Sequence, residues 1–506
     1  MESTRLQSAG YSDFDVAQAD IDPSTMLDIL PDEILREILS HCFANSTSQE
    51  FGQRDVPFLQ QRTAIMLTCG RFYRIIEDKI FCKYVTISSP HMMATAIQKS
   101  GELPLFVDGT FIRFSEFSGH DMLRLGQLIN AAARILSLDL TTSRELLRQW
   151  TRPMPMLEEL TLKRTRTGHH NLGAHQNEEF LLVPFRSSHL WKLHLKGFTW
   201  RSIESLLTSA VEDCSVKDVP GKTATRSFLR GLGQMPNLRR LNVATDMKRG
   251  NVQDPYPVTL THLESLAVRV KEAEDAKFLA CITAPSLRQL SLSILAPDDD
   301  VPAIMGYAMS SIQQIAANQD LQSAWIDAPE SRRLFVSLGE EESPHTGVHL
   351  MFKNIRKQKI LLDLVKEQLG PYLHTVENLE LSDGDGYLPS AKISRYELFE
   401  TMGRVRYLRV QGRASEAIPS GLAYRKGNEK EYRTVFPQLE DLILESVRFR
   451  PHKKKSRKAF LNDLIRSFQH RDQARKPKHL TVCEGTGFRE TDIPKLKRFV
   501  DNVELT

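Results

Sequence analysis

The sequence predicts an α/β protein in which a small helical N-terminal domain precedes a parallel sheet backed by helices. Two observations predict the larger part: a short apolar pattern recurs eight times along the chain, and amphipathic helical segments lie between its copies. The smaller part follows from two apolar helical segments, in residues 30–42 and 64–81. The chain has 506 residues, and one elongated array of repeats would replace the roughly three globular domains that this length suggests.

Composition excludes several classes of protein. Hydrophobic residues make up 41% and charged residues 26% of the chain, as in ordinary folded domains. No apolar run reaches the roughly 18 residues that a membrane span needs. The N-terminal segment carries one basic residue, Arg5, among several acids, which fits neither a secretory signal nor a transit peptide. The six cysteines are scattered without a C-x-x-C pair, which predicts neither a zinc module nor a disulfide framework. We therefore expect a cytoplasmic or nuclear protein without membrane contact.

The positive charge of the chain is local. The net charge is +4, but residues 446–479 carry 12 Lys and Arg against 2 Asp, which puts that segment at +10 and the rest at −6. Its densest group of cations consists of Lys453, Lys454, Lys455, Arg457 and Lys458. This group is a candidate signal for nuclear import or a site for nucleic acid or anionic lipid, and a plain exposed basic loop is the alternative. The acidic remainder argues against nucleic acid as the main partner.

The motifs of catalytic, cofactor and metal sites are incomplete in this chain. Residues 221–223 resemble the end of a phosphate-binding loop, but Val216 stands where the first glycine is required. Residues 383–386 resemble part of a calcium loop, but Ser394 replaces its bidentate carboxylate. Three histidines within residues 169–175 have no carboxylate or thiol at ligand spacing, which favours a solvated loop. We therefore expect a non-catalytic protein without a cofactor or metal.

The first elements along the chain are helical. Residues 1–25 are expected to be disordered, and residues 26–85 to form a helical domain. Pro31 suits the first position of a helix, and the acidic residues after it lie at the positive end of the helix dipole. The apolar residues of this helix fall on one stripe, which consists of Ile34, Leu35, Ile38, Leu39 and Cys42. Two or three short helices form a core that is marginal unless a neighbour completes it, so a partner protein could cover this stripe. Packing of the stripe on the rest of the chain is the alternative.

Eight segments then match the pattern [LV]-x-x-L-x-[LV], where about two would arise by chance for this composition. They begin at Leu157, Leu190, Leu238, Leu263, Leu287, Val376, Val405 and Leu439, and a proline stands two residues before half of them. The last two apolar positions of each lie on one face of a short strand. One such unit cannot bury that face alone, but stacked units can, which predicts a parallel sheet backed by helices over residues 86–506. Isolated strands of separate domains are the alternative.

The remaining elements fill the intervals between these segments. Residues 135–140 and 478–482 are expected to add an early and a terminal strand. The intervals are uneven, and insertions are expected near residues 163–189, 207–235 and 296–375, as loops or helices beside the sheet. Residues 355–369 form an amphipathic helical pattern that should stop at Gly370-Pro371. Residues 460–468 form a second such pattern, and both should pack on the sheet.

The repeated segments resemble leucine-rich repeats, whose L-x-x-L-x-L pattern they share. The starts at Leu238, Leu263 and Leu287 fit the period of that family. The asparagine or cysteine that the family places three positions after the strand is absent from all eight segments. Because that residue satisfies backbone groups of the turn, the resemblance implies an irregular leucine-rich-repeat solenoid, with its concave sheet as a surface for protein recognition.

Residues 26–85 resemble the F-box, whose pattern L-P-x-E-[IL]-[LI]-x-x-[IL] is followed by V-C-[KR]-x-[WF]. The residues that match and would bind the partner are Leu30, Pro31, Glu33, Ile34, Leu35, Ile38, Leu39, Cys69, Phe72 and Ile75. Phe72 and Phe81 stand where the family has tryptophans, and Gly70 stands at its basic position. An F-box followed by irregular leucine-rich repeats is an arrangement found in fungal F-box proteins. The resemblance implies that these residues dock on a Skp-type adaptor and, through it, on a cullin.

The resemblance thus implies a substrate-recognition subunit of an SCF-type cullin-RING ubiquitin ligase, in which the repeats hold an unknown target protein. Such a subunit is not an enzyme, because it contributes proximity to a ubiquitin-charged enzyme rather than chemistry. Two alternatives remain: a repeat scaffold without a ubiquitin role, and a nuclear or nucleic-acid-binding protein that uses residues 446–479. A purified chain that does not bind the adaptor would favour the first alternative. Salt-sensitive binding of DNA or RNA would favour the second.

Overall fold

The structure is a computed structural model of the chain. It describes residues 31, 34, 35, 37, 82–87, 90–110, 119–164, 181–248, 256–328, 333–340, 343–353, 358–383, 397–412, 418, 422–424, 433–446, 457–471, 476–484 and 490–506. The chain divides into two compact units, Met1–Leu105 and Phe106–Thr506. The boundary between them falls later than the one expected after residue 85.

The described part of the first unit begins with a helical segment. Ile34, Leu35 and Glu37 are helical, and the Leu35 amide donates a hydrogen bond of 3.1 Å to the Pro31 carbonyl. This bond has the N–H(i) to O=C(i−4) pattern of an α-helix. Strand β1 (Tyr84–Ile87) and helix α6 (Pro90–Lys99) follow. The rest of the helical domain expected over residues 26–85 lies outside the described residues.

The second unit is built on one large, mostly parallel sheet. In the order of their pairing, its strands are β3, β4, β5, β6, β7, β9, β11, β14, β13, β12, β15, β16, β19, β20 and β21. The first run comprises β3 (Ile135–Thr142), β4 (Glu159–Arg164), β5 (Lys192–Lys196), β6 (Asp213–Lys217), β7 (Arg240–Ala244), β9 (Ser265–Val270) and β11 (Gln289–Ile294). The centre comprises β12 (Ser323–Asp327), β13 (Arg333–Glu340) and β14 (Ser343–Lys353). The last run comprises β15 (Asn378–Asp383), β16 (Tyr407–Gly412), β19 (Asp441–Glu445), β20 (His479–Cys483) and β21 (Asn502–Leu505).

Further strands complete the described set. Strand β2 (Leu105–Thr110), which belongs to the second unit from Phe106 on, pairs with β3 in the large sheet. Strand β8 (Val258–Thr259) pairs in parallel with β10 (Ile282–Thr283), and β17 (Ala423–Tyr424) pairs antiparallel with β18 (Arg433–Thr434).

All eight repeated segments form strands of the large sheet, and so do the two additional segments, as β3 and β20. The prediction of an α/β protein with a parallel sheet backed by helices is therefore confirmed. The apolar positions carry the core: Leu160 and Leu162 of β4 have no exposed surface, and the register aligns Leu160 with Leu138 and Leu193 on the neighbouring strands. Rows of stacked leucines therefore run across the strands.

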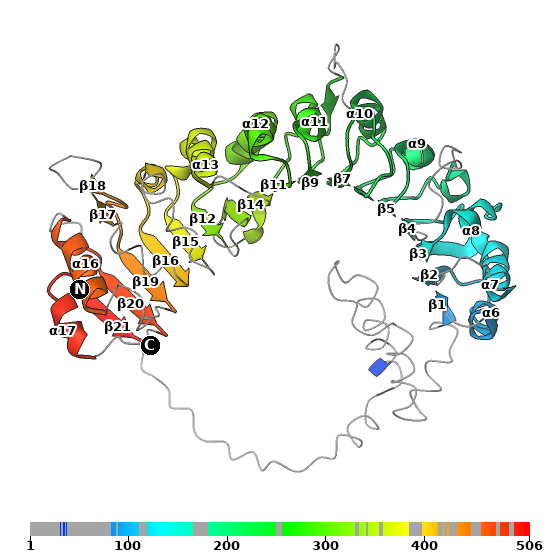
Figure 1. Cartoon of the computed structure of the whole chain (residues 1–506). Helices are drawn as coiled ribbons and strands as arrows, with labels where there is room; N and C mark the ends of the chain where they lie inside the picture. Colours follow the sequence, from blue (N-terminus) through cyan, green and yellow to red (C-terminus); the bar gives the residue numbers. More distant parts are fainter. Residues whose placement is uncertain are drawn as a thin grey trace, which may run out of the picture. The chain divides into compact units, whose positions relative to one another are not determined.

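The helices of this unit cover the other side of that apolar layer. They are α7 (Gly119–Asn130), α8 (Arg144–Arg148), α9 (Trp200–Ile203), α10 (Thr225–Gly233), α11 (Ala273–Ala276), α12 (Val301–Asn318), α13 (Gln358–Leu373), α16 (Arg457–Gln469) and α17 (Ile493–Leu496). Helices α9 to α13 lie on the outer side of the curved sheet, while the strands line its inner side (Figure 1). Successive helical segments contact one another through aromatic rings, since Phe228 of α10 lies 4.8 Å from Trp200 and 4.9 Å from Phe278.

Helix α13 differs from its prediction at the C-terminal end. The helix continues through Gly370 and Pro371 to Leu373. Leu369 and Leu373 have no exposed surface. Burial of these two leucines therefore outweighs the backbone hydrogen bond that Pro371 cannot make.

The interval of residues 296–375 is part of the sheet, which corrects the prediction of an insertion beside it. The chain passes from β11 through α12 to β12, which pairs in parallel with β15. Strand β13 then runs antiparallel to β12, and β14 runs antiparallel to β13 and parallel to β11. The chain thus skips two strand positions and returns to fill them before α13 leads to β15. We call β12, β13 and β14 the antiparallel insertion.

The interval of residues 207–235 also belongs to the regular sheet. It contains β6 and α10, and β6 pairs in parallel with both β5 and β7. The repeat pattern missed β6 because Cys214, which is 1% exposed, occupies the position of the central leucine. Of the third interval, residues 163–164 end β4 and residues 181–189 contain a short 3-10 turn at Val183–Phe185, while residues 165–180 lie outside the described part.

Candidate functional site on the inner sheet face

Three of the ten residues predicted to bind the adaptor are described. Pro31 is exposed, Ile34 is 42% exposed, and Leu35 is 2% exposed. Ile34 thus offers apolar surface, whereas Leu35 is buried. Leu30, Glu33, Ile38, Leu39, Cys69, Phe72 and Ile75 lie outside the described residues.

The basic candidates divide in the same way. Arg457 and Lys458 are the first residues of α16, so two cations stand at the positive end of a helix dipole. Lys453, Lys454 and Lys455 lie outside the described residues.

The inner face of the sheet brings polar and aromatic side chains together in rows. Alternate residues of a strand point to opposite faces, and the residues between the buried leucines therefore point away from the helices. One row crosses eleven strands near the carboxyl ends of the parallel strands. We call it the edge row, and it runs through Thr141, Lys163, Lys196, Lys217, Ala244, Arg269, Ser293, Met351, Phe335, Asp327 and Ser382.

One end of the edge row is cationic. Lys163, Lys196, Lys217 and Arg269 occupy four of five consecutive positions, and we call them the basic strip. Neighbouring strands lie about 4.8 Å apart, so the cations repeat at nearly that spacing, with one gap at Ala244. Each of the four follows directly on an apolar residue of its strand, namely Leu162, Leu195, Val216 and Val268.

The charges of the basic strip act on one another. Partial burial and the positive charges of Arg269 and Lys196 lower the pKa of Lys217 below its ordinary value, although Asp218 opposes this effect. Asp139 contacts Lys163 at 3.1 Å and Asp218 contacts Lys196 at 3.5 Å. Both carboxylates lie outside the edge row. The row itself therefore concentrates positive charge that an anionic partner would stabilise.

Asp213 joins two strands beside the basic strip. Its carboxylate contacts the Nε2 atom of His194 at 3.2 Å and the Nε atom of Arg240 at 3.1 Å. Partial burial alone would raise the pKa of Asp213, but the hydrogen bond to His194 and the positive charge of Arg240 lower it below the ordinary value. The ion pair of Asp213 with Arg240 thus neutralises charge in the row formed by the first residues of the strands.

The middle of the inner face is aromatic. Trp325 of β12 is 40% exposed, and its ring packs edge-on against Phe335 of β13 at 4.9 Å. The ring of His349 on β14 stacks against the ring of Phe335, with their centroids 6.4 Å apart. The Nδ1 atom of His349 lies 2.8 Å from the Ser337 hydroxyl. We call Trp325, Phe335 and His349 the aromatic platform. It consists entirely of residues from the antiparallel insertion.

Beyond the platform the inner face carries a tight ion pair. Arg409 of β16 donates to Glu445 of β19 from Nε at 3.0 Å and from Nη2 at 2.7 Å, and Gln411 donates to the second carboxylate oxygen at 2.6 Å. Both oxygens of Glu445 are therefore satisfied within the sheet. Partial burial and nearby carboxylates raise the pKa of Tyr407 on the same face, although Arg409 opposes them.

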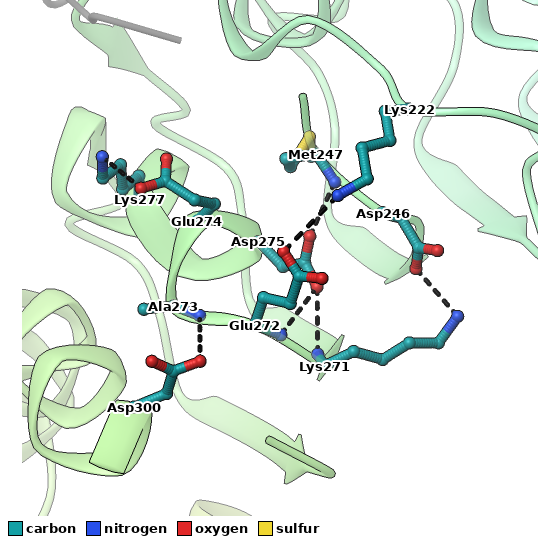
Figure 2. A network of polar contacts seen from close by, with 10 residues as sticks. All are labelled: Lys222, Asp246, Met247, Lys271, Glu272, Ala273, Glu274, Asp275, Lys277 and Asp300. Carbon is teal, nitrogen blue, oxygen red and sulfur yellow. Dashed lines mark hydrogen bonds and ion pairs between the residues drawn. The ribbon is translucent and has the colours of Figure 1, made fainter. Parts of the chain in front are cut away.

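A buried carboxylate holds the loops next to the basic strip. Asp275 is 3% exposed and accepts hydrogen bonds from the amides of Met247 at 2.6 Å, Lys271 at 3.0 Å and Glu272 at 3.0 Å (Figure 2). Burial raises the pKa of Asp275, and the three backbone bonds oppose that rise. The loops after β7 and β9 are thus tied to one side chain. In this part of the chain one carboxylate therefore satisfies backbone amides of two loops.

The same network connects further loops. The Lys271 ammonium contacts Asp246 at 2.8 Å, and the Ala273 amide donates to Asp300 at 3.4 Å (Figure 2). Lys271 lies two residues after Arg269, so these contacts hold the end of β9 and with it one position of the basic strip.

The described residues contain no other arrangement typical of a reactive site. They include no group of three or more His, Cys, Asp or Glu residues that could hold a metal ion. Burial raises the pKa of the Cys214 thiol to about 12, which makes it a poor nucleophile at neutral pH. Among the helices that are described, none has the length and apolar character to span a membrane.

No protein-family model matches this chain, and no curated protein is significantly similar to it in sequence.

The sequence contained a signal for only one part of this site. In three strands, a lysine of the basic strip directly follows the last apolar residue of the strand. In the fourth, Arg269 stands just before the final valine of the strand. The aromatic platform had no comparable signal, because its rings come from three strands whose pairing depends on the antiparallel insertion.

Proposed function

We propose that the chain is a substrate-recognition subunit of an SCF-type cullin-RING ubiquitin ligase, with an F-box in residues 26–85 and an irregular leucine-rich-repeat solenoid after it. The F-box-like pattern of residues 30–39 carries the first half of this proposal. The helical hydrogen bond between Leu35 and Pro31 and the exposed apolar surface of Ile34 support it. An amphipathic helix with exposed apolar residues fits a hydrophobic groove on an adaptor protein.

The inner sheet face supports the second half of the proposal. Its side chains are cationic at one end and aromatic at the centre, which is a surface suited to holding another protein rather than to transforming a small molecule. A receptor of this kind would position its target near a ubiquitin-charged enzyme.

The adaptor-binding half is tested by pull-down of a Skp-type adaptor with the full-length chain. Leu30→Ala combined with Pro31→Ala should abolish the pull-down, because the two residues open the apolar helix of the F-box pattern. Leu181→Ala combined with Val183→Ala is a matched control, since these two exposed apolar residues of the second unit are 48% and 52% exposed. Retained binding in the first variant, with the adaptor bound equally by wild type and control, would contradict the docking site.

A further inference from the structure

We propose that the inner sheet face binds an extended acidic protein segment with one apolar residue, its acidic side chains on the basic strip and its apolar side chain on the aromatic platform. The inference deepens the proposed function, on which it rests for the role of that segment as part of a target. It concerns only the second unit of the chain.

The positive charge of the basic strip favours acidic residues in one half of the bound segment. Lys163, Lys196, Lys217 and Arg269 lie in one row with no carboxylate among them. Partial burial lowers the pKa of Lys217, and the positive charges of Arg269 and Lys196 lower it further. A row of carboxylates laid across the strands would remove the repulsion between these like charges.

The exposed surface of the aromatic platform favours an apolar residue in the other half of the bound segment. Trp325 is among the large apolar residues that remain exposed, at 40%, and Phe335 supports it from the next strand at 4.9 Å. Met351 lies between Phe335 and the basic strip in the edge row, so the apolar surface continues the same line. Exposed tryptophans held by neighbouring rings are typical anchors for a partner side chain.

Spacing sets the length of the segment. From Lys163 to Phe335 the edge row crosses seven strand steps. At about 4.8 Å per step this path is about 34 Å long, which is about ten residues of extended chain. The acids should therefore precede or follow the apolar residue by a few positions and should not extend past it, because Asp327 borders the platform on its far side.

The carboxylates beside the basic strip favour a protein segment over nucleic acid. Asp139 and Asp218 contact members of the basic strip, and Glu159 and Asp213 lie on the same strands. A phosphate backbone carries one charge per nucleotide and would meet these carboxylates, whereas a protein segment can place its acids on the strip alone. A few cations on one row are also sparse for a nucleic-acid footprint.

The test is a selection from a displayed random library of peptides about twelve residues long, a length that covers the edge row. Full-length wild type, Lys196→Glu with Arg269→Glu, and Trp325→Ala serve as baits. Arg226→Glu with Arg230→Glu is the matched control, because it reverses two exposed cations on the outer helix α10. Binding of the selected peptides is then measured by fluorescence anisotropy at low and high salt, and thermal melting confirms that each variant is folded.

We expect wild type to select peptides that combine several Asp or Glu residues with one aromatic or aliphatic residue. The charge reversal on the strip should weaken their binding by at least about tenfold, and the control by less than about twofold. Trp325→Ala should weaken the same peptides by about fivefold or more. Added salt should weaken binding of wild type as well.

Four outcomes would overturn the inference: no enrichment above background, enrichment of Lys and Arg, equal binding to the strip variant, or a single-stranded oligonucleotide that displaces the selected peptides. The selection uses no adaptor, and the adaptor pull-down uses no target. Failure of peptide binding therefore leaves the adaptor result standing, and loss of adaptor binding leaves the peptide result standing.

Discussion

The parallel run β3–β11 and the antiparallel insertion β12–β14 build the same inner face through different connections. In the run, consecutive strands pair in parallel, and the connections between them include the outer helical segments. In the insertion, β12, β13 and β14 follow one another directly and pair antiparallel. The run presents cations in the edge row, and the insertion presents Met351 and Phe335 in the same row.

This difference shows how a change of connection alters the chemistry of a surface. Parallel strands need a crossover that brings each chain back to the same end of the sheet, so similar repeats place similar residues in one row. The insertion removes two crossovers and places residues of opposite strand direction in register. It also brings backbones close together, because Gly347 of β14 has a φ of 100° beside Leu338 and Gly339 of β13.

The largest expected effect is a loss of stability that is confined to the antiparallel insertion. In Gly347→Ala, the new Cβ would collide with the Leu338 carbonyl oxygen and lie 2.8 Å from the Gly339 Cα, at a φ that disfavours alanine. We expect a loss of roughly 3–5 kcal/mol in the free energy of unfolding of this region. Hydrogen exchange should show lost protection in residues 323–353 and retained protection in β3 to β9.

Gly306→Ala is the control for this substitution. Gly306 lies in α12, and a Cβ there meets no atom within 4 Å. Alanine should leave stability unchanged or raise it by about 0.5–1 kcal/mol, because glycine is a poor helix former. Equal exchange in the two variants would contradict the proposed close approach of β13 and β14.

The next effect acts on the parallel run. Asp275→Ala leaves the amides of Met247, Lys271 and Glu272 without their acceptor. We expect a loss of about 3 kcal/mol or more, because each buried amide then lacks a hydrogen bond. Chemical denaturation would give the size of the loss, and faster exchange at residues 247 and 271–272 would give its place. Asp300→Ala should cost less than about 1 kcal/mol, since Asp300 accepts one long bond of 3.4 Å.

The smallest effect tests the charge pairing of the run. The pKa of Asp213 is lowered in the folded chain, so its contribution to stability is present above the unfolded pKa of about 3.9 and is lost as the pH falls through the folded pKa. Asp213→Asn should therefore flatten the fall in stability below about pH 4, by less than about 1 kcal/mol. Thermal unfolding of wild type and variant between neutral and acid pH measures this difference. Identical acid slopes would show that the Asp213 carboxylate has no favourable pairing.

Some of the candidate site was accessible from sequence. The i and i+2 spacing of apolar residues predicted the strand face that is buried, and so also the positions that point to the inner face. Missing signals had local causes: Cys214 in place of a leucine concealed β6, and the interval of residues 296–375 carried no repeat pattern to reveal three strands. Helix α13 passed through Gly370 and Pro371 because buried leucines on both sides held it in place.

For the eight repeated segments and the two additional ones, the sequence by itself determined that they form strands and which of their faces is apolar, since alternation over a few residues is a local property of an extended chain. Only the tertiary structure decided that β14 pairs with β11 and β12 with β15, because strand pairing depends on contacts between residues far apart in the chain. That pairing places Phe335 and Met351 in line with Lys163, Lys196, Lys217 and Arg269. The inner face exists as a continuous surface only through this register.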